Sequence, residues 1–224
     1  MLFRRVPCWI VACSLLVVLA ASDLFAQGSS DAQALTPWRP RLDITAGVGW
    51  INGRAQSASR YDNWYNDAAW YGVEAGFYLT ENVKLEVGAG AAGEGFAWSQ
   101  ETRFDTLGRP IEWITSNHGH SSRTVSAGVT YQFGSNAWVH PYLGGGVDVD
   151  RVKIRTTSYR SGQNYPGTGE DPEVVTFETV GHAFAVAGAK VYFSQRVFLR
   201  ADVKATGRTG LNKVIARFGL GVDF

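Results

Sequence analysis

The chain has 224 residues, and its 21 Lys and Arg against 20 Asp and Glu give a formal net charge of +1 at pH 7. This balance gives no reason to expect a nucleic-acid partner, which would call for a basic patch or stripe. Glycine is frequent at 26 residues, aromatic residues make up 13% of the chain, and only 18% of residues are charged. Such a composition favours an all-β chain of one domain.

Residues 1–26 are predicted to be a secretory signal peptide. Arg4 and Arg5 form a basic start, residues 9–21 are an almost unbroken apolar run, and Ala26 offers a small residue for cleavage. The run is shorter than the roughly 20 residues that a membrane-spanning helix needs. Both cysteines of the chain lie in this segment, so the mature chain is expected to contain neither a disulfide nor a reactive thiol.

Residues 27–40 are rich in Ser, Gln, Ala and Pro and are predicted to form a flexible lead-in to one domain over 41–224. Within that domain, apolar residues occupy every second position, which is typical of strands with one apolar face. The first such segment places Leu42 and Ile44 on one face and Asp43 on the other. Eight segments alternate in this way: 41–51, 71–79, 83–91, 124–133, 139–149, 182–193, 196–204 and 214–224.

The connections between these segments alternate in length. Three are short enough for hairpin turns, at 80–82, 134–136 and 194–195. The others are predicted to be longer polar loops, at 53–68, 98–121, 156–174 and, shorter, 205–211. An even number of alternating strands with short turns at one end is the signature of a bacterial outer-membrane β-barrel. A sheet in hydrocarbon must close on itself, because no backbone polar group can stay unpaired there.

We therefore predict an all-β fold, an eight-stranded antiparallel up-and-down transmembrane β-barrel in the cell outer membrane, with both termini periplasmic. The alternative is a soluble barrel or sandwich whose apolar face points inward. A solvated polar face would explain the charges on the second face. It would not explain the signal peptide, the terminal Phe224 or the asymmetry of the loops.

The less apolar face of the strands carries seven acidic and seven basic residues. An eight-stranded barrel is just wide enough for side chains to fill, and buried charges must be paired. We therefore predict a plugged barrel rather than an open channel. Its predicted charge network consists of Glu74, Lys84, Glu86, Asp148, Lys190, Arg200, Asp202 and Arg217. The remaining charged residues of this face are Asp43, Asp150, Asp223, Arg196, Lys204 and Lys213.

The chain resembles the eight-stranded outer-membrane proteins of the OmpA-like, opacity-antigen-like superfamily over roughly 40–224. The resemblance lies in "PYLGGGVDV" at 141–149, in "GAKVYF" at 188–193 with its tight turn into "RVFLRADV", and in the terminal "FGLGVDF". In such families the terminal aromatic residue is part of the signal read by the barrel assembly machinery. The resemblance thus implies that Phe224 is an assembly signal and that the assembly machinery is a partner during biogenesis.

A few eight-stranded barrels modify lipid A, and one pair of residues invites that comparison. His120 and Ser122 lie two positions apart, on one face of a strand. They resemble the His-x-Ser of outer-membrane lipid A deacylases, which also need a nearby carboxylate to orient the histidine. Residues 123–147 contain no Asp or Glu. We therefore expect no enzymatic activity and keep a lipid A-modifying hydrolase and a small channel as alternatives.

The first long loop is the best candidate for a binding surface. It contains four aromatic residues of the kind that make contact surfaces: Tyr61, Trp64, Tyr65 and Trp70. An aromatic girdle at the membrane interface is the alternative interpretation. No metal or cofactor is expected. The predicted role is structural and interactive, with outer-membrane lipid as surroundings and an unidentified surface ligand as partner.

Overall fold

The computed structural model describes residues 41–54, 64–133, 138–162, 165–208 and 210–224. The predicted signal peptide and lead-in lie outside these residues. Among the described residues, no helix is long and apolar enough to cross a membrane. The strands are β1 (Leu42–Arg54), β2 (Trp64–Tyr78), β3 (Val83–Phe104), β4 (Pro110–Gln132), β5 (Val139–Gly162), β6 (Tyr165–Glu170), β7 (Val174–Tyr192), β8 (Val197–Gly207) and β9 (Leu211–Asp223).

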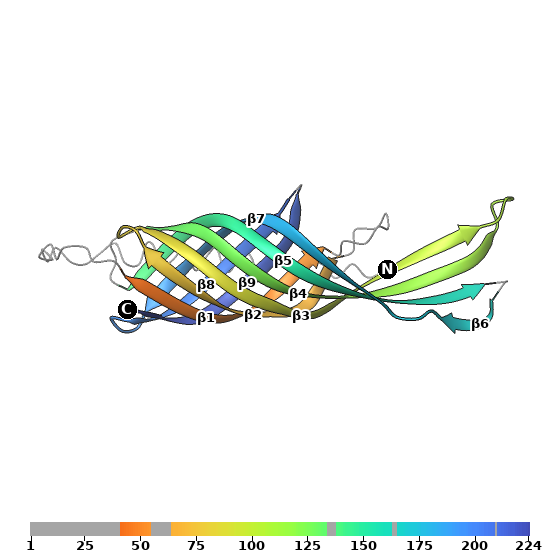
Figure 1. The fold of residues 1–224 in the computed structure, drawn as a ribbon, viewed down its shortest axis with the longest axis horizontal. Helices are drawn as coiled ribbons and strands as arrows, with labels where there is room; N and C mark the ends of the chain where they lie inside the picture. The colour runs from red at the N-terminus through yellow and green to blue at the C-terminus, as the bar shows by residue number, and fades with distance from the viewer. Residues whose placement is uncertain (1–40, 55–63, 134–137, 163–164, 209) are drawn as a thin grey trace, which may run out of the picture.

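Eight of the described strands close into a ring, in the order β1-β2-β3-β4-β5-β7-β8-β9 and back to β1 (Figure 1). Every neighbouring pair is antiparallel, and the closing pair β1–β9 runs in register from Asp43↔Asp223 to Gly53↔Lys213. This ring confirms the predicted eight-stranded antiparallel barrel. The short strand β6 is an addition that the sequence did not predict, and it pairs with the far end of β5 outside the ring.

The outer face of the ring is apolar, as the alternation predicted. One row of paired residues runs from Val73 through Ala89 and Val125 to Val149 across four strands. These valine side chains are 51–65% exposed, although they would be core residues in a soluble protein. The inner face carries the polar partners of the alternation, which excludes the soluble alternative with its apolar interior.

One end of the barrel has short turns and both described chain ends. Strands β2 and β3 are joined by residues 79–82, and β7 and β8 by 193–196, as predicted. The backbone amide of Phe224 donates to the carbonyl of Leu42 at 2.8 Å, which joins the two ends of the described chain. The third predicted turn falls largely on residues 134–137, which lie outside the described residues. We call this end the short-turn end.

At the opposite end, β3, β4 and β5 continue far beyond the ring, and β7 begins a short way beyond it. Figure 1 shows β3, β4 and β5 leaving the barrel as long twisted strands, with β6 near their far end. We define this projecting sheet as residues 95–104, 110–121, 153–162 and 174–177 together with β6. The predicted loops 98–121 and 156–174 are therefore wrong as loops, and most of the 205–211 connection is also strand.

The projecting sheet leaves the ring where β3 changes register. Strand β2 pairs with β3 only as far as Trp70↔Ala92, and a bulge lies between Ala92 and Gly95. A bulge inserts an extra residue and increases the local bend and twist of a strand. Here it marks the place where β3 loses β2 as a neighbour and continues with β4 alone.

A tight turn closes the tip of the β3–β4 hairpin. The carboxylate of Asp105 accepts hydrogen bonds from the backbone amides of Leu107 at 2.9 Å and Arg109 at 2.8 Å. Gly108 has a φ of +75°, a left-handed conformation that favours glycine. These turn residues allow the strands to run to residues 104 and 110, so a five-residue turn replaces the predicted loop.

Candidate functional site

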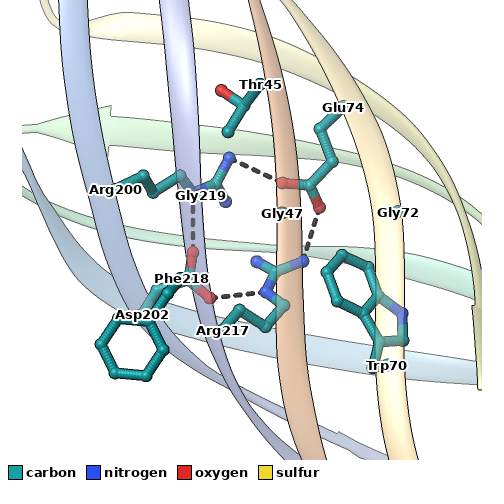
Figure 2. A pocket seen from close by; sticks show the side chains of 10 residues that line it. All are labelled: Thr45, Gly47, Trp70, Gly72, Glu74, Arg200, Asp202, Arg217, Phe218 and Gly219. Carbon is teal, nitrogen blue, oxygen red and sulfur yellow. Dashed lines mark hydrogen bonds and ion pairs between the residues drawn. The ribbon is translucent and has the colours of Figure 1, made fainter.

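The centre of the barrel holds a closed square of two arginines and two carboxylates. Nη1 atoms of Arg200 and Arg217 lie 2.7 and 2.5 Å from the two oxygens of Glu74. Their Nε atoms donate to the two oxygens of Asp202 at 2.7 and 2.6 Å. Figure 2 shows the four side chains converging from β2, β8 and β9. Arg200 also donates to Glu86, which links the square to β3.

A second cluster lies toward the short-turn end, around Asp43. Its carboxylate accepts hydrogen bonds from Lys84 at 3.2 Å and from Lys190, and also from the hydroxyl of Tyr78 at 3.1 Å. That hydroxyl in turn accepts from Lys190 at 2.8 Å and from the amide of Gln132 at 2.9 Å. One buried carboxylate thus faces two ammonium groups, with the phenol hydroxyl between them.

A third level lies toward the projecting sheet. Lys204 Nζ is 2.7 Å from Asp148, and Lys213 Nζ is 2.7 Å from Asp150. His182 Nε2 lies 3.7 Å from the same Asp150 carboxylate. Ion pairs therefore cross the interior at three heights along the barrel, each joining strands that are distant in sequence.

The structure brings all eight residues of the predicted network into the interior. Six are buried, and Glu74 and Glu86 each keep 11% of their side-chain surface exposed. The wider set needs one correction, because Arg196 is exposed in the turn between β7 and β8. The predicted segment 196–204 begins one residue too early, because β8 begins at Val197. At the same end of the barrel, Nη1 of Arg41 lies 3.9 Å from Asp223.

Three tyrosines belong to the interior, although sequence reasoning gave them no role. Besides Tyr78, Tyr142 accepts a hydrogen bond from Arg200 at 2.6 Å, and Tyr192 donates to Asp223 at 2.7 Å. All three stand on the polar face of the alternation, at the same parity as the charged residues. Their positions in the alternation could have predicted this, because a tyrosine on an inward face must bury its hydroxyl against a hydrogen-bond partner.

Two small voids lie between these interior groups. One void borders Trp70, Glu74 and Arg217, and another lies between Asp148 and Lys204; each holds about 10 Å³. That is room for about one water molecule each. Among the described residues, no group of three or more His, Cys, Asp and Glu side chains is placed to hold a metal ion.

The predicted aromatic binding loop is only partly described. Tyr61 and the side chains of Trp64 and Tyr65 lie outside the described residues. Trp70 is described, and it differs from the expectation: it is only 8% exposed and points inward from β2 (Figure 2). The guanidinium of Arg217 lies 5.4 Å from the centre of its ring. Trp70 is therefore part of the interior packing, because β2 begins earlier than predicted and puts Trp70 on the inward face.

The inward-facing side of the projecting sheet is held together by polar contacts. His118 is 3.0 Å from the hydroxyl of Ser99 and 3.1 Å from that of Thr156. Farther out, Arg160 lies 3.4 Å from Glu112 and 2.7 Å from Asp171. Burial lowers the pKa of His118 below its ordinary value of 6.5, which favours the neutral ring. These contacts join β3, β4 and β5 across both ends of the sheet.

The candidate catalytic pair, His120 and Ser122, lies on β4 near the end of the ring. His120 is 5% exposed in β4, and Ser122 follows on the same inward face. The carboxylate of Asp150, on the adjacent strand β5, is held by Lys213 and Thr124. The hydrolase alternative stays a prediction, and a change in lipid A acyl composition between wild type and Ser122→Ala would be needed to support it.

Comparisons with known proteins agree with this geometry. The family model for the outer membrane protein beta-barrel domain matches residues 13–224. The N-terminal β-barrel domain of OprF from Pseudomonas aeruginosa is 19% identical, with 82% of this chain and 97% of that chain covered and a TM-score of 0.50. Neisserial surface protein A is 14% identical, with 81% and 95% covered and a TM-score of 0.49.

The attachment invasion locus protein Ail of Yersinia pestis is 11% identical, with 84% of this chain and all of that chain covered and a TM-score of 0.47. At 19% identity, the likeness to the OprF domain concerns the fold alone. A comparison with curated protein sequences found no significant match.

Proposed function

The chain belongs to the family of outer membrane proteins with this β-barrel domain, and from that premise we propose that it is a plugged, non-enzymatic anchor for a surface-contact sheet. The barrel holds the protein in the outer membrane. The projecting sheet stands on the outside of the cell and carries the contact surface. The observation that carries this proposal is the contrast between an interior crossed by buried ion pairs and an exposed aromatic face on strands that continue past the ring.

The ion pairs support the plugged state. Moving an ion through the barrel would require separating pairs such as Arg217–Glu74 and Lys204–Asp148, at 2.5 and 2.7 Å. Breaking a buried pair leaves an uncompensated charge, which costs about 3–5 kcal/mol. Because such pairs occur at three heights, a continuous water path would have to break several of them together.

The two faces of the projecting sheet support a contact role. The inward face is linked by the hydrogen bonds and ion pairs described above. The opposite face exposes large side chains, with Trp98 at 64%, Trp113 at 37% and Tyr159 at 40%. Trp98 pairs with Asn117, which pairs with Thr157, so polar residues stand between the aromatics. Exposed tryptophan and tyrosine beside polar groups are typical of binding surfaces.

A labelling experiment tests the orientation. Residues 27–224 contain no cysteine, so one introduced cysteine reports one place. Thr106→Cys puts a thiol in the exposed turn of the β3–β4 hairpin, and Gln195→Cys puts one in the exposed turn at the short-turn end. On intact cells, a membrane-impermeant maleimide should label Thr106→Cys and leave Gln195→Cys unlabelled until the outer membrane is permeabilised. The reverse pattern would overturn the proposed placement, and wild type gives the background.

Conductance tests the plug separately. Purified protein in planar bilayers should show no stable single-channel steps at neutral pH. Glu74→Gln with Asp202→Asn removes both negative charges of the central square and should raise leakage if the ion pairs seal the interior. Stable channels in the wild-type protein would favour the small-channel alternative.

We also propose that Phe224 acts as an assembly signal. Its side chain is 68% exposed at the short-turn end, and its backbone pairs with Leu42 where β9 meets β1. Phe224→Asp should lower the amount of folded protein in the outer membrane several-fold, while refolding of purified protein into lipid vesicles stays close to wild type. Equal loss in both assays would point to barrel stability instead of recognition.

A further inference from the structure

The outward face of the barrel changes character within one step along β4 and β5. The pair Val125↔Val149 ends the apolar rows, with side chains 65% and 51% exposed. The next outward pair is Arg123↔Arg151. Outward residues on a strand are two positions apart, so the charges begin about 7 Å beyond the last valines. Lys153 follows at the next outward position of β5.

These three cations, which we call the basic rim cluster, form no ion pair with any acidic residue that the structure describes. Arg123 and Arg151 stand directly opposite one another on neighbouring strands, and like charges in that position destabilise a sheet. Within the described ranges, none of Arg123, Arg151 and Lys153 forms an ion pair. The next outward arginine on β5 does: Arg155 lies 3.7 Å from Glu94 and 3.3 Å from Glu173.

The basic rim cluster lies in a hollow on this outward face. The hollow has a volume of about 440 Å³ and reaches from Tyr71 on β2 to Phe177 on β7. Ser121, on the same face of β4 as Arg123, also lines it and adds a hydroxyl donor to the cationic groups. The guanidinium of Arg151 lies 5.5 Å from the centre of the Phe177 ring. Tyr71 and Phe177 are 56% and 59% exposed, so both ends of the hollow are aromatic.

We propose that this hollow binds the phosphorylated headgroup of a membrane lipid, with the phosphate on Arg123, Arg151 and Lys153. A phosphate offers several acceptor oxygens to guanidinium and ammonium donors and offsets the repulsion between the facing arginines. Acyl chains of the same lipid would lie along the exposed valines one row below. The aromatic rings suit the boundary between hydrocarbon and headgroups. The inference rests on the proposed function only for the choice of the outer leaflet.

The position of the cluster favours a lipid over a dissolved anion. A site for a soluble polyanion would gain from lying far out on the projecting sheet, whereas Arg123 and Arg151 lie in the barrel wall and Lys153 is the first residue of the projecting sheet on β5. The cluster instead adjoins the last exposed apolar row, where charged lipid headgroups are concentrated. Clusters of Lys and Arg next to a membrane-spanning segment gain affinity for anionic lipids from each cation.

Lipid binding by the purified full-length protein in a neutral detergent tests the proposal. Native mass spectrometry would compare bisphosphorylated lipid A with the same lipid after removal of its phosphates. Arg123→Gln, Arg151→Gln and Lys153→Gln together should weaken binding of the phosphorylated lipid about 100-fold, and Arg123→Gln alone about fivefold. The control is Arg103→Gln, Arg196→Gln and Arg208→Gln, which removes the same charge from exposed positions outside the hollow and should change affinity less than twofold.

Each outcome decides the proposal, provided that heat-modifiable migration shows the variants to be folded; the single Arg123→Gln variant serves if the triple variant is not. Equal affinity in wild type and cluster variant, or equal binding of the dephosphorylated lipid, overturns it. Competition by inorganic phosphate at the same phosphate concentration as the lipid would mean a dissolved anion and would overturn the lipid assignment. This measurement uses purified protein, so its result does not depend on which end of the barrel faces the outside of the cell. The lipid-binding test can therefore fail while the maleimide labelling succeeds, and the reverse can also occur.

Discussion

Four of the eight strands of the barrel wall, β3, β4, β5 and β7, continue into the projecting sheet, yet the two regions follow different rules. In the wall, one face meets hydrocarbon and the other a narrow interior. Apolar and polar residues therefore alternate strictly, and charges inside are paired. We expect both faces of the projecting sheet to meet water, and there the alternation is weaker and threonine and serine occupy both faces. The surroundings of a strand, and not its backbone, impose the period-two pattern from which the strand can be predicted.

The largest expected difference between the two regions concerns arginine. Arg200 contacts Glu74, Glu86 and Asp202 in the wall, with 4% of its side chain exposed. Arg200→Ala would leave these carboxylates short of a partner and should cost about 3–5 kcal/mol of unfolding free energy. Urea unfolding in lipid vesicles, followed by heat-modifiable migration, measures it.

The matched change in the projecting sheet is Arg103→Ala. Arg103 forms an ion pair with Glu112 at 3.2 Å, but 51% of its side chain is exposed. An exposed pair contributes about 1 kcal/mol or less. If the two alanine variants unfold at the same urea concentration, the interior network does not stabilise the barrel as its burial implies.

A second difference concerns the outward face. Val147, which is 59% exposed in the apolar part of β5, should not tolerate a cation: Val147→Arg is expected to cost about 2–4 kcal/mol in a bilayer. Trp98→Arg lies on the same face but in the projecting sheet and should cost close to nothing. Unfolding in vesicles of both variants locates the end of the hydrocarbon contact. Equal costs would mean that the projecting sheet also meets lipid.

A third, smaller difference concerns glycine. A Cβ atom at Gly90, in the wall, would lie 2.6 Å from the indole nitrogen of Trp70, whereas one at Gly93, in the bulge, would meet nothing closer than 3.7 Å. Gly90→Ala should therefore destabilise the barrel by about 1–3 kcal/mol through overpacking. Gly93→Ala should leave stability nearly unchanged. Adding Trp70→Leu to Gly90→Ala should recover part of the loss, which separates a clash with the ring from a backbone effect.

The smallest expected effect lies in the turn at the tip of the projecting sheet. Hydrogen bonds from the backbone amide of Arg109, its guanidinium and the amide of Leu107 lower the pKa of Asp105 below the ordinary 3.8. A lowered pKa in the folded state means that the carboxylate stabilises the turn above pH 3.8 and that this contribution is lost as the pH falls further.

Amide exchange at Leu107 and Arg109 measures this effect. Protection should decline below pH 3.8 in the wild type and should be low at every pH in Asp105→Ala, while the barrel strands keep theirs. Acid loss of protection throughout the wall at the same pH would show that the turn does not titrate independently.

Sequence reasoning succeeded where the surroundings differ between the two faces. The parity of Lys84, Arg200 and Asp202 within their strands was enough to place them inside, and eight alternating segments were enough for the ring. It failed at Trp70, because an aromatic residue near a predicted loop fits an interface girdle as well as an interior position. It failed at Arg196 because parity has no meaning in a turn.

The projecting sheet was not predicted from the sequence, for a related reason. Between residues 98 and 121, polar residues and glycine interrupt the alternation, and the turn signal at Asp105 and Gly108 stands within a segment that reads as a polar loop. Strand propensity alone does not distinguish a sheet with both faces in water from an irregular loop. The pairing of β3 with β4 as far as Phe104↔Pro110 depends on neighbours that the local sequence does not specify.

By itself, the sequence determined the all-β class, the number of ring strands and the faces of the charged residues, because a closed sheet in hydrocarbon allows one pattern only. Tertiary structure alone decided which acid meets which base, since partners such as Asp43 and Lys190 lie 147 positions apart. It also brought Arg123 opposite Arg151 and set both beside the last apolar row. Register across a ring is a property of all its strands together, and no single segment contains it.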